Sequence, residues 1–340
     1  MMELTKKDTK MLQGLSVLAM VWLHLFDTWN YKGLFYPLLF FKGIPVAVYI
    51  AQLSDFCVMG FAFCSGYAHY KISQRNDYYK SRLRSLFKLI IRYWTVLIVF
   101  CIVSVFAGKQ GYMPASLRSF LLHFFFLGGS YNGAWWYLFA YVVIVLVSPF
   151  LLSNIRKKPL LVTALISAVL YCLSYYYRFR IHAVGVFLSR LGPLGMTVVE
   201  YIMGAVAAKI NYFTLVGKIW NRIARHIRAF LSIVLLLIML IFRTLIVPSM
   251  FVAPVTGLVI ITLFHIWKKP DLMERFFLFI GAHSTHIWLT HMFFYLYLFN
   301  GLVYKAIYPL AIYAFMIVIT LTVSVILNYI EKPIYSALNL

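Results

Sequence analysis

Long apolar runs alternate along the chain with short polar or basic segments. Most of these runs have the length that a helix needs to cross a bilayer, and backbone groups at that depth must bond within the helix. We therefore predict an all-α polytopic membrane protein with about ten transmembrane helices and with both termini in the cytoplasm. The predicted spans lie near residues 12–29, 54–70, 88–107, 134–153, 161–176, 195–211, 229–247, 250–268, 283–300 and 308–330.

The segments between these spans contain no soluble domain, long linker or repeat, so residues 1–340 are expected to form a single membrane-embedded domain. The longest connecting segments are 30–53 and 108–133. Within the second, the apolar stretch 121–127 is shorter than a span and is expected to be re-entrant or interfacial. The first apolar run is followed by no small-residue cleavage site, and we interpret it as the first span.

Composition and charge support this class. The chain is 63% hydrophobic and only 12% charged, which no soluble domain of this size matches. The net charge of +22 suggests nucleic acid, but most of the 31 Lys and Arg fall on the predicted cytoplasmic side, as the positive-inside rule requires. The four cysteines are expected to pack as small apolar residues. Arg178, Arg180 and Arg190 fall on a predicted outside segment, either as a solvated loop or as contacts for an anionic substrate.

His24 is the first candidate for chemistry. It lies inside the first apolar run, where a titratable group is costly unless it is paired or faces a polar cavity. Asp27 follows three residues later, on the same face of a helix. A carboxylate beside an imidazole fixes its tautomer and favours its protonated form. A core histidine that hydrogen-bonds a neighbouring helix is an equally good interpretation of this pattern.

A basic stretch precedes the third span and contains Arg82, Arg84, Lys88 and Arg92. Topology alone explains a basic loop, but Arg92 falls inside the span and needs a partner or an anionic ligand. Lys88 and Arg92 share one helix face. A guanidinium binds phosphate with two parallel hydrogen bonds, so a phosphate-rich ligand would suit this face.

Two further groups are titratable residues near span ends. The ninth span opens with His283, His286 and Thr290 on one face, followed by His291, the deepest of these histidines. A zinc site is the alternative for this run, but no carboxylate or thiol lies near in sequence and we predict no metal. Glu200 and Glu331 are acids in or at spans. Glu331 is expected to pair with a base such as Arg84 or Arg92, and either acid could be structural.

Several short motifs occur in a fixed order along the chain. The first span carries Gly14 to His24, the second carries Phe61 to Tyr67 with Ser65, and Arg92-Tyr-Trp heads the third. Asn132-Gly-Ala-Trp135-Trp136 precedes the fourth, Ile287 to His291 lies in the ninth, and Glu331-Lys-Pro ends the tenth. In this order the segments resemble the acyltransferase family three membrane proteins, bacterial enzymes that O-acylate surface glycans. The resemblance covers nearly the whole length.

Two positions depart from that family. The family commonly has an arginine eleven residues before its histidine, where this chain has Gln13. The family also often has Arg-x-x-Arg at the start of the third span, and the basic residues here are spaced differently. If those arginines hold acyl-CoA phosphates, the donor site is altered and the acyl group need not be acetyl.

The resemblance implies a multi-pass enzyme of the bacterial inner membrane that moves an acyl group, expected to be acetyl, from cytoplasmic acyl-CoA to a sugar hydroxyl of a glycan or glycolipid. It implies His24 as general base, oriented by Asp27, with His291 relaying a proton or stabilising charge. Acyl-CoA would bind as co-substrate, with no bound cofactor, at Gln13, Arg82, Arg84, Lys88 and Arg92.

The resemblance also implies a further set of polar and aromatic residues at the membrane site: Ser65, Glu200, Glu331, Trp135 and Trp136. The expected partners are the lipid bilayer, acyl-CoA and the acceptor, without nucleic acid; a homo-oligomer is left open.

Two other functions fit the residues. A transporter or flippase of lipid-linked saccharides would explain the spans and the intramembrane His and Arg, but not the ordered segments. A non-catalytic scaffold would not explain the ionisable groups inside the spans.

Overall fold

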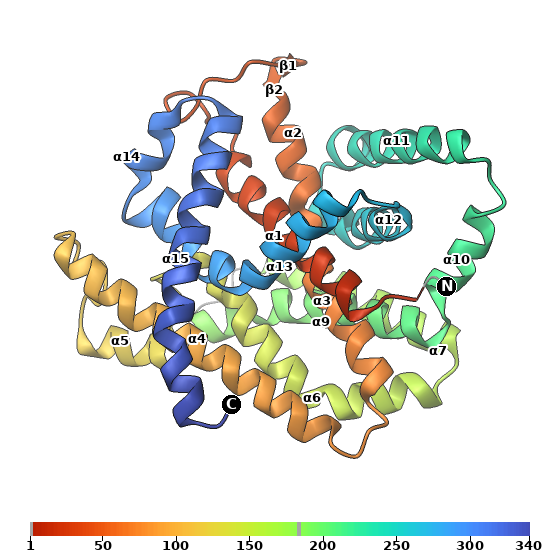
Figure 1. The fold of residues 1–340 in the computed structure, drawn as a ribbon, viewed down its shortest axis with the longest axis horizontal. Coiled ribbons are helices and arrows are strands. Elements are labelled where there is room, and N and C mark those ends of the chain that lie inside the picture. The colour runs from red at the N-terminus through yellow and green to blue at the C-terminus, as the bar shows by residue number, and fades with distance from the viewer. Residues whose placement is uncertain (1–2, 182–184) are drawn as a thin grey trace. The chain divides into compact units, whose positions relative to one another are not determined.

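The computed structural model describes residues 3–181 and 185–340, which are helical almost throughout (Figure 1). The elements in order are α1 (Lys6–Phe26), β1 (Phe40–Phe41), β2 (Ile44–Pro45), α2 (Val46–Leu53), η1 (Ser54–Phe56), α3 (Cys57–Ile72), α4 (Tyr78–Phe106), α5 (Leu117–Phe124), η2 (Gly133–Trp135), α6 (Trp136–Lys157), α7 (Leu160–Arg180) and α8 (Val186–Ser189). They continue with α9 (Leu191–Lys209), α10 (Tyr212–Trp220), α11 (Arg225–Ile241), η3 (Phe242–Ile246), η4 (Met250–Val252), α12 (Ala253–Ile266), α13 (Asp271–Met292), η5 (Phe293–Tyr297), α14 (Asn300–Val303), η6 (Tyr304–Ala306) and α15 (Pro309–Ala337).

The all-α membrane class is confirmed. In the described ranges, eight helices are long and apolar enough to cross a membrane, or nine if the bent pair Asp271–Tyr297 and Asn300–Ala306 is one span. The helix at Met250–Ile266 is apolar but shorter. Each of the predicted runs therefore contains a helix.

Three helical segments extend beyond the apolar runs that were predicted as spans. α4 begins at Tyr78 rather than near residue 88, so Arg82 and Arg84 are helical. Residues 46–53, expected in a connecting segment, form α2. Arg178 and Arg180 lie in the last turn of α7 rather than in a loop. In α4 and α7 the hydropathy pattern reports only the apolar part of a helix, whereas lysine and arginine continue the helix readily beyond it.

The described chain divides into two compact units, each made of separate stretches of sequence. Met1–Lys71, Glu200–Ser284 and Ile307–Tyr313 form the first unit, and Ile72–Val199, Thr285–Ala306 and Ala314–Leu340 form the second. The expectation of one domain for the whole chain stays a prediction.

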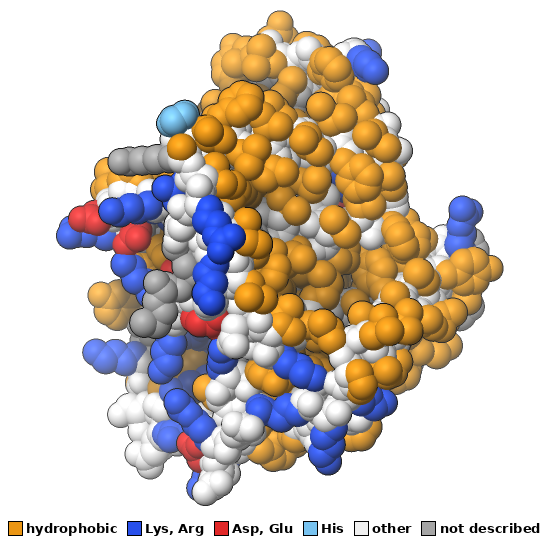
Figure 2. Space-filling view, turned by 90° about the vertical axis from the view of Figure 1, so that its right-hand side faces the viewer, with side chains coloured by type: hydrophobic (Ala, Val, Ile, Leu, Met, Phe, Trp, Pro, Cys, Tyr) orange, Lys and Arg blue, Asp and Glu red, His pale blue; other side chains and the backbone are white. Residues whose placement is uncertain are grey.

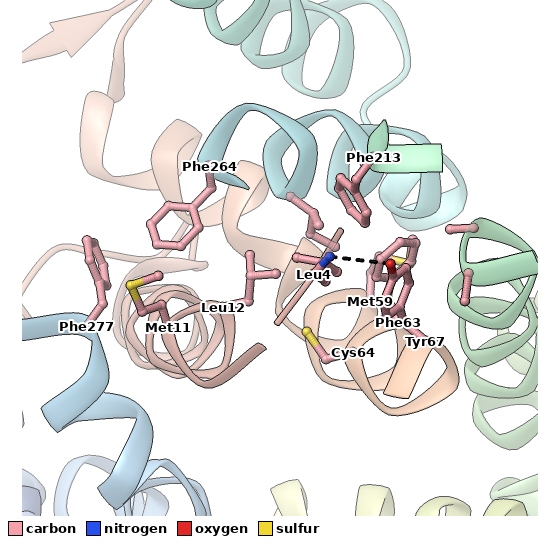
Figure 3. Close-up of a cluster of buried hydrophobic side chains, with 13 residues drawn as sticks. Leu4, Met11, Leu12, Met59, Phe63, Cys64, Tyr67, Phe213, Phe264 and Phe277 are labelled. Atoms are coloured by element: carbon pink, nitrogen blue, oxygen red, sulfur yellow. Dashed lines mark hydrogen bonds between the residues drawn. The ribbon is translucent and has the colours of Figure 1, made fainter. Parts of the chain in front are cut away.

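In the first unit, α1 begins at a capping box. The Thr5 hydroxyl accepts from the Asp8 backbone N–H, and the Asp8 carboxylate accepts from the Thr5 N–H, so two donors that lack helical partners are satisfied. The helix then packs its apolar side into a core with α3, α12 and the start of α10 (Figure 3). The backbone N–H of Leu4 donates to the Tyr67 hydroxyl in the same core.

Two glycines allow α1 to approach α13 closely. A Cβ atom on Gly14 would lie 2.3 Å from the carbonyl oxygen of Phe277, and one on Gly281 would lie 2.1 Å from that of Lys10. Real side chains never come so near, and the obstacle in each case is backbone. Small residues let membrane helices pack backbone to backbone, which is how this pair is joined.

In the second unit, polar and aromatic contacts join distant segments. The Tyr78 hydroxyl donates to Ser148 over 2.8 Å and links α4 to α6. Phe100 stacks on Phe293 with 4.3 Å between ring centroids. Arg190, predicted on an outside segment, is buried and donates to the carbonyls of Phe126 and Gly128. Arg190 therefore fixes a backbone turn rather than forming part of a solvated loop.

The surface is strongly apolar. α7 exposes Leu161, Leu165, Val169 and Leu173, which recur every four residues on one stripe. Figure 2 shows one face of the molecule, with broad hydrophobic areas and with Lys and Arg gathered outside them. Exposed apolar stripes of this size are expected where helices face lipid. Of the four cysteines, Cys57, Cys64 and Cys101 are buried as predicted, whereas Cys172 is exposed.

Replacing Gly14 with valine should unfold or severely destabilise the protein, because the new side chain must displace the backbone of α13. The cost should exceed the roughly 1–3 kcal/mol of ordinary overpacking. The matched control is Gly111→Ala, since a Cβ atom there meets nothing within 4 Å. The measurement is thermal unfolding of the detergent-solubilised protein. Equal melting temperatures for the two variants would contradict the close approach.

Candidate functional site

His24 occupies the last turn of α1 and is partly buried. Two hydrogen bonds fix the backbone around it. The Trp22 indole N–H donates to the Ala47 carbonyl at the start of α2 over 3.1 Å, and the Tyr313 hydroxyl donates to the Leu18 carbonyl over 3.0 Å. A packed helix therefore positions the imidazole, as a catalytic or binding group requires.

Asp27 lies directly after the last residue of α1, Phe26, and closes the turn that carries His24. Asp27 is the C-cap residue, with non-helical backbone angles, and its N–H still donates to the Leu23 carbonyl over 2.9 Å. The residue is exposed, yet the protein around it desolvates the carboxyl group. Desolvation raises the pKa of Asp27, and attraction to the Arg243 guanidinium opposes that rise.

Arg243 and Asp55 form a buried ion pair in the same unit that sequence reasoning missed. Nε and Nη2 of Arg243 both lie 2.7 Å from Oδ2 of Asp55, and the two residues are only 5% and 2% exposed. Arg243 lies on the π-helical turn η3 and Asp55 on the 3-10 turn η1. The sequence held one signal for this pair, a charged residue near one end of each of two predicted spans, 54–70 and 229–247.

The other residues predicted for this unit lie apart from that pair. Gln13 accepts from the Lys10 ammonium over 3.2 Å, so a cation stands one turn before the position of the family's arginine. Ser65 donates to the Phe61 carbonyl within its own helix, which is an ordinary structural bond. Glu200 is buried in α9.

In the second unit, Glu331 is the centre of a polar network. Its carboxylate is fully buried, with Oε1 2.7 Å from Nε2 of His286 and Oε2 3.5 Å from Nε of Arg92. The Tyr335 hydroxyl lies 3.1 Å from Oε2. The pairing of Glu331 with Arg92 that the sequence suggested is therefore confirmed, and His286 is an additional partner that it did not suggest.

The network selects one tautomer of a neutral His286. An ionised Glu331 can only accept, so Nε2 of a neutral His286 carries the hydrogen and donates it. Nδ1 of His286 is then an acceptor for the Ser324 hydroxyl, 3.1 Å away. The ring is held between two partners on α15.

Basic residues on α4 extend from this network. Arg84, Lys88 and Arg92 recur every four residues and so share one face of α4. The Lys88 ammonium lies 5.9 Å from the centre of the Tyr335 ring, and the Arg84 guanidinium donates to the Asn339 carbonyl. Arg82 is off this face and donates to Ser81. Arg92 is about one-third exposed, so this face is anchored at one end and accessible.

The segment before α6 and the second half of α13 hold each other by reciprocal bonds. The side chains of Asn132 and Trp135 donate to the Leu289 carbonyl over 3.1 and 3.0 Å. The Trp288 indole donates back to the Ala134 carbonyl over 3.1 Å. These bonds give a structural role to Asn132 and Trp135, two of the positions that the sequence singled out.

His291 follows this segment and is completely buried. Its Nδ1 lies 2.8 Å from the Trp288 carbonyl, an oxygen that can only accept, so Nδ1 carries the hydrogen. A neutral His291 then has its lone pair on Nε2. The guanidinium of Arg178 lies 5.7 Å from the centre of the Trp136 ring, which gives Trp136 a cationic neighbour.

The predicted residues thus fall into two sets. The first unit holds Gln13, His24, Asp27, Ser65 and Glu200, and the second holds Arg82, Arg84, Lys88, Arg92, Trp135, Trp136, His291 and Glu331. Within the second set, Arg92 and Glu331 come together with His286. Within the first, the positive charge of Arg243 opposes the rise that desolvation causes in the pKa of Asp27.

Comparison with known proteins identifies one family. The family described as an acyltransferase domain matches residues 9–329, nearly the whole chain. Among curated proteins and among solved structures, nothing matches significantly.

Replacing Glu331 with alanine should destabilise the protein by about 3–5 kcal/mol, because His286 and Arg92 lose a buried acceptor. Glu274→Ala is the control. Glu274 pairs with Lys7 at the surface, where an ion pair contributes roughly 0–1 kcal/mol. Unfolding of both purified variants would be followed by intrinsic fluorescence. A Glu331 variant as stable as the control would show that the network does not support the fold.

Proposed function

The chain belongs to the acyltransferase family three membrane proteins and is a multi-pass membrane acyltransferase, and we propose that it transfers the acyl group of an acyl-CoA to a sugar hydroxyl of a glycan or glycolipid. Family membership favours this function over the transporter and the scaffold. The observation that carries the choice of donor is the basic face of α4, which is anchored at Arg92 by the buried Glu331.

The donor would bind along that face. Acyl-CoA presents several phosphate groups, and Lys88 and Arg84 continue the positive charge one and two turns before Arg92. Glu331 and Tyr335 contact Arg92 through Nε, so the planar end of the guanidinium lies outside these two contacts. Because a guanidinium offers five donors in a fixed fork, one edge can hold the acid while another binds phosphate.

The position of Gln13 bears on the same donor. A glutamine carries no charge, but the Lys10 ammonium donates to its side-chain oxygen. We assign to Lys10 the positive charge that the family's arginine supplies at this turn of α1. Lysine acts as a point charge rather than a planar fork, so this contact would be less selective for phosphate geometry.

Transfer would take place at His24. Its imidazole removes the proton of the acceptor hydroxyl as the sugar oxygen attacks the thioester carbonyl carbon. The new carbon–oxygen bond forms, the carbon–sulfur bond breaks, and the proton passes to the departing thiolate of CoA. Asp27 orients the imidazole and stabilises its protonated form, and His291, with its lone pair on Nε2, relays a proton or stabilises charge.

The acceptor would use the tryptophans. Trp135 is fixed by its bond to Leu289 and Trp136 stands beside Arg178. A planar ring packs well on the apolar face of a sugar, and Arg178 adds a donor for its hydroxyl groups or for an anionic sugar. The inner membrane of a bacterium, with acyl-CoA on its cytoplasmic side, is the corresponding location.

Replacing His24 with alanine should lower acyl transfer by at least about 100-fold, the smaller end of the range for a general base. The assay follows label from radioactive acetyl-CoA and succinyl-CoA into glycan in membranes that contain the protein. His226→Ala is the control, since His226 is exposed at the start of α11. Undiminished transfer by a well-inserted His24 variant would remove His24 from the reaction.

Replacing Lys88 with glutamine should raise the KM for acyl-CoA by about tenfold and change kcat little, since one charged contact to phosphate contributes about 1.5–3 kcal/mol. Lys109→Gln is the control, because Lys109 is exposed beyond the other end of α4. The measurement is initial rate against acyl-CoA concentration. If kcat fell while KM stayed constant, Lys88 would act on the chemistry and not on donor binding.

A further inference from the structure

His123 lies in the segment between α4 and α6, and the roles assigned so far do not use it. The residue is 2% exposed and belongs to α5, which is too short to cross a membrane. Its backbone carbonyl accepts from the Tyr93 hydroxyl of α4 over 2.7 Å. α4 therefore fixes the backbone that carries this buried imidazole.

The hydrogen bonds of the ring require its neutral form. Nδ1 lies 2.8 Å from the Ser119 carbonyl, an oxygen that can only accept, so Nδ1 carries a hydrogen. Nε2 accepts from the backbone N–H groups of Ser130 and Tyr131 over 3.1 and 3.2 Å. Protonation would place a hydrogen on Nε2 as well. Because three N–H groups would then face one another, both bonds to the backbone would be lost.

The turn after α5 is folded around this ring. The Tyr131 ring stacks on the imidazole with 3.6 Å between centroids and 3° between planes. A Cβ atom on Gly128 would lie 2.4 Å from Nδ1 of His123, so a larger residue there would displace the ring. Arg190 donates to the Phe126 and Gly128 carbonyls of the same turn. The imidazole is thus a structural centre of the turn.

This turn leads directly into the proposed acceptor segment. Tyr131, whose N–H is bound by His123, precedes Asn132 in the chain. Asn132 and Trp135 both donate to the Leu289 carbonyl of α13. His123 therefore holds one end of the segment and α13 holds the other, and each link between the imidazole and Trp135 is a hydrogen bond or the chain itself.

We propose that neutral His123 is a positioning residue for the acceptor, and that its protonation releases the segment carrying Trp135 and Trp136 and so weakens acceptor binding. The inference rests on the acceptor role proposed for these two tryptophans. It makes acceptor binding sensitive to pH and leaves donor binding at the basic face of α4 unchanged.

The surroundings of His123 favour its neutral form. Residues 78–199 contain no Asp or Glu, so no carboxylate of this stretch can stabilise a protonated ring. Burial lowers the pKa of His123, the bond to the Ser119 carbonyl opposes this, and the charge of Arg190 lowers the pKa further. The titratable and charged groups that face His123 or its turn are Tyr93 on α4, the exposed Arg118 on α5, Tyr112 and Tyr131 on the connecting segment, Arg190 after α8 and Tyr297 on η5.

The sign of the pH effect follows from the lowered pKa. The segment is held in place above the usual pKa of histidine, roughly 6.5, and is released as the pH falls through the lower pKa of His123 in the folded protein. One pH unit below that pKa, about one molecule in ten keeps the neutral ring. The KM for the acceptor should then be about tenfold higher, because only that fraction can bind.

Amide hydrogen exchange of the purified protein in lipid nanodiscs measures the release directly. Protection of the Ser130 and Tyr131 amides, corrected for the intrinsic effect of pH, should fall at least about tenfold between pH values of about 7.5 and 4, while the amides of α6 stay protected. In His123→Gln, a side-chain oxygen that does not titrate can accept from the same amides, so protection should persist. Wild-type protein that keeps this protection at the lower pH would overturn the proposal.

Transfer assays test whether the release reaches the acceptor. The varied substrate is glycan extracted from membranes of the producing cells, with the labelled acyl-CoA held constant. The KM for glycan should rise at low pH in the wild type and in the control His226→Gln, whose histidine is exposed, but not in His123→Gln. The KM for acyl-CoA should follow one course in all three proteins.

A parallel rise in the KM for glycan in the wild type and in His123→Gln would overturn the inference, because the titrating group would then lie elsewhere. Failure of the proposed function has a different appearance. It would be seen as absence of transfer by the wild type at every pH, or as full transfer by His24→Ala, whereas the exchange experiment would still report on the release of the segment.

Discussion

The structure depends on two buried carboxylates, Glu331 and Asp55, that pair with charged or titratable groups carried inward by its apolar helices. A lone arginine or carboxylate among membrane helices is too costly to keep, so each such group fixes the place of another. Glu331 does this in the second unit, where His286 on α13, Arg92 on α4 and Tyr335 on α15 all meet its carboxylate. Asp55 does it in the first unit for Arg243. Three helices are joined at Glu331 by one polar group rather than by apolar packing alone.

The same constraint connects fold and chemistry. A buried acid that pairs with an arginine also determines which ring nitrogen of a neighbouring histidine carries the hydrogen, as Glu331 does for His286. The positive charge of Arg243 likewise opposes the rise that desolvation causes in the pKa of a second carboxyl, Asp27. Groups of this kind are hard to assign to stability or to function alone, because one contact serves both.

The helices and the family were predictable because hydropathy and ordered motifs are local in the sequence. The pairing of Glu331 with Arg92 was predictable because an arginine inside a span demands a partner. The partnership of His286 with Glu331 was not, since the residues are 45 positions apart and the helix face of His286 also suggested a zinc site. Asp55 and Arg243 were missed for the same reason, at a separation of 188 positions. Helix ends were also beyond the sequence pattern, so the early start of α4 and the cap at Asp27 emerged only from the backbone.

The reciprocal bonds between the Asn132–Trp135 segment and α13 have a mechanical consequence. Donors on each side are matched by acceptors on the other, so neither segment can slide or rotate without breaking bonds in both directions. His291 lies one helical turn after Ile287 and is hydrogen-bonded to the Trp288 carbonyl. It must therefore move together with the two bonded segments. Any movement of the second half of α13 would therefore carry the Asn132–Trp135 segment and the His291 imidazole with it. The two segments, although remote in sequence, would move as one rigid body.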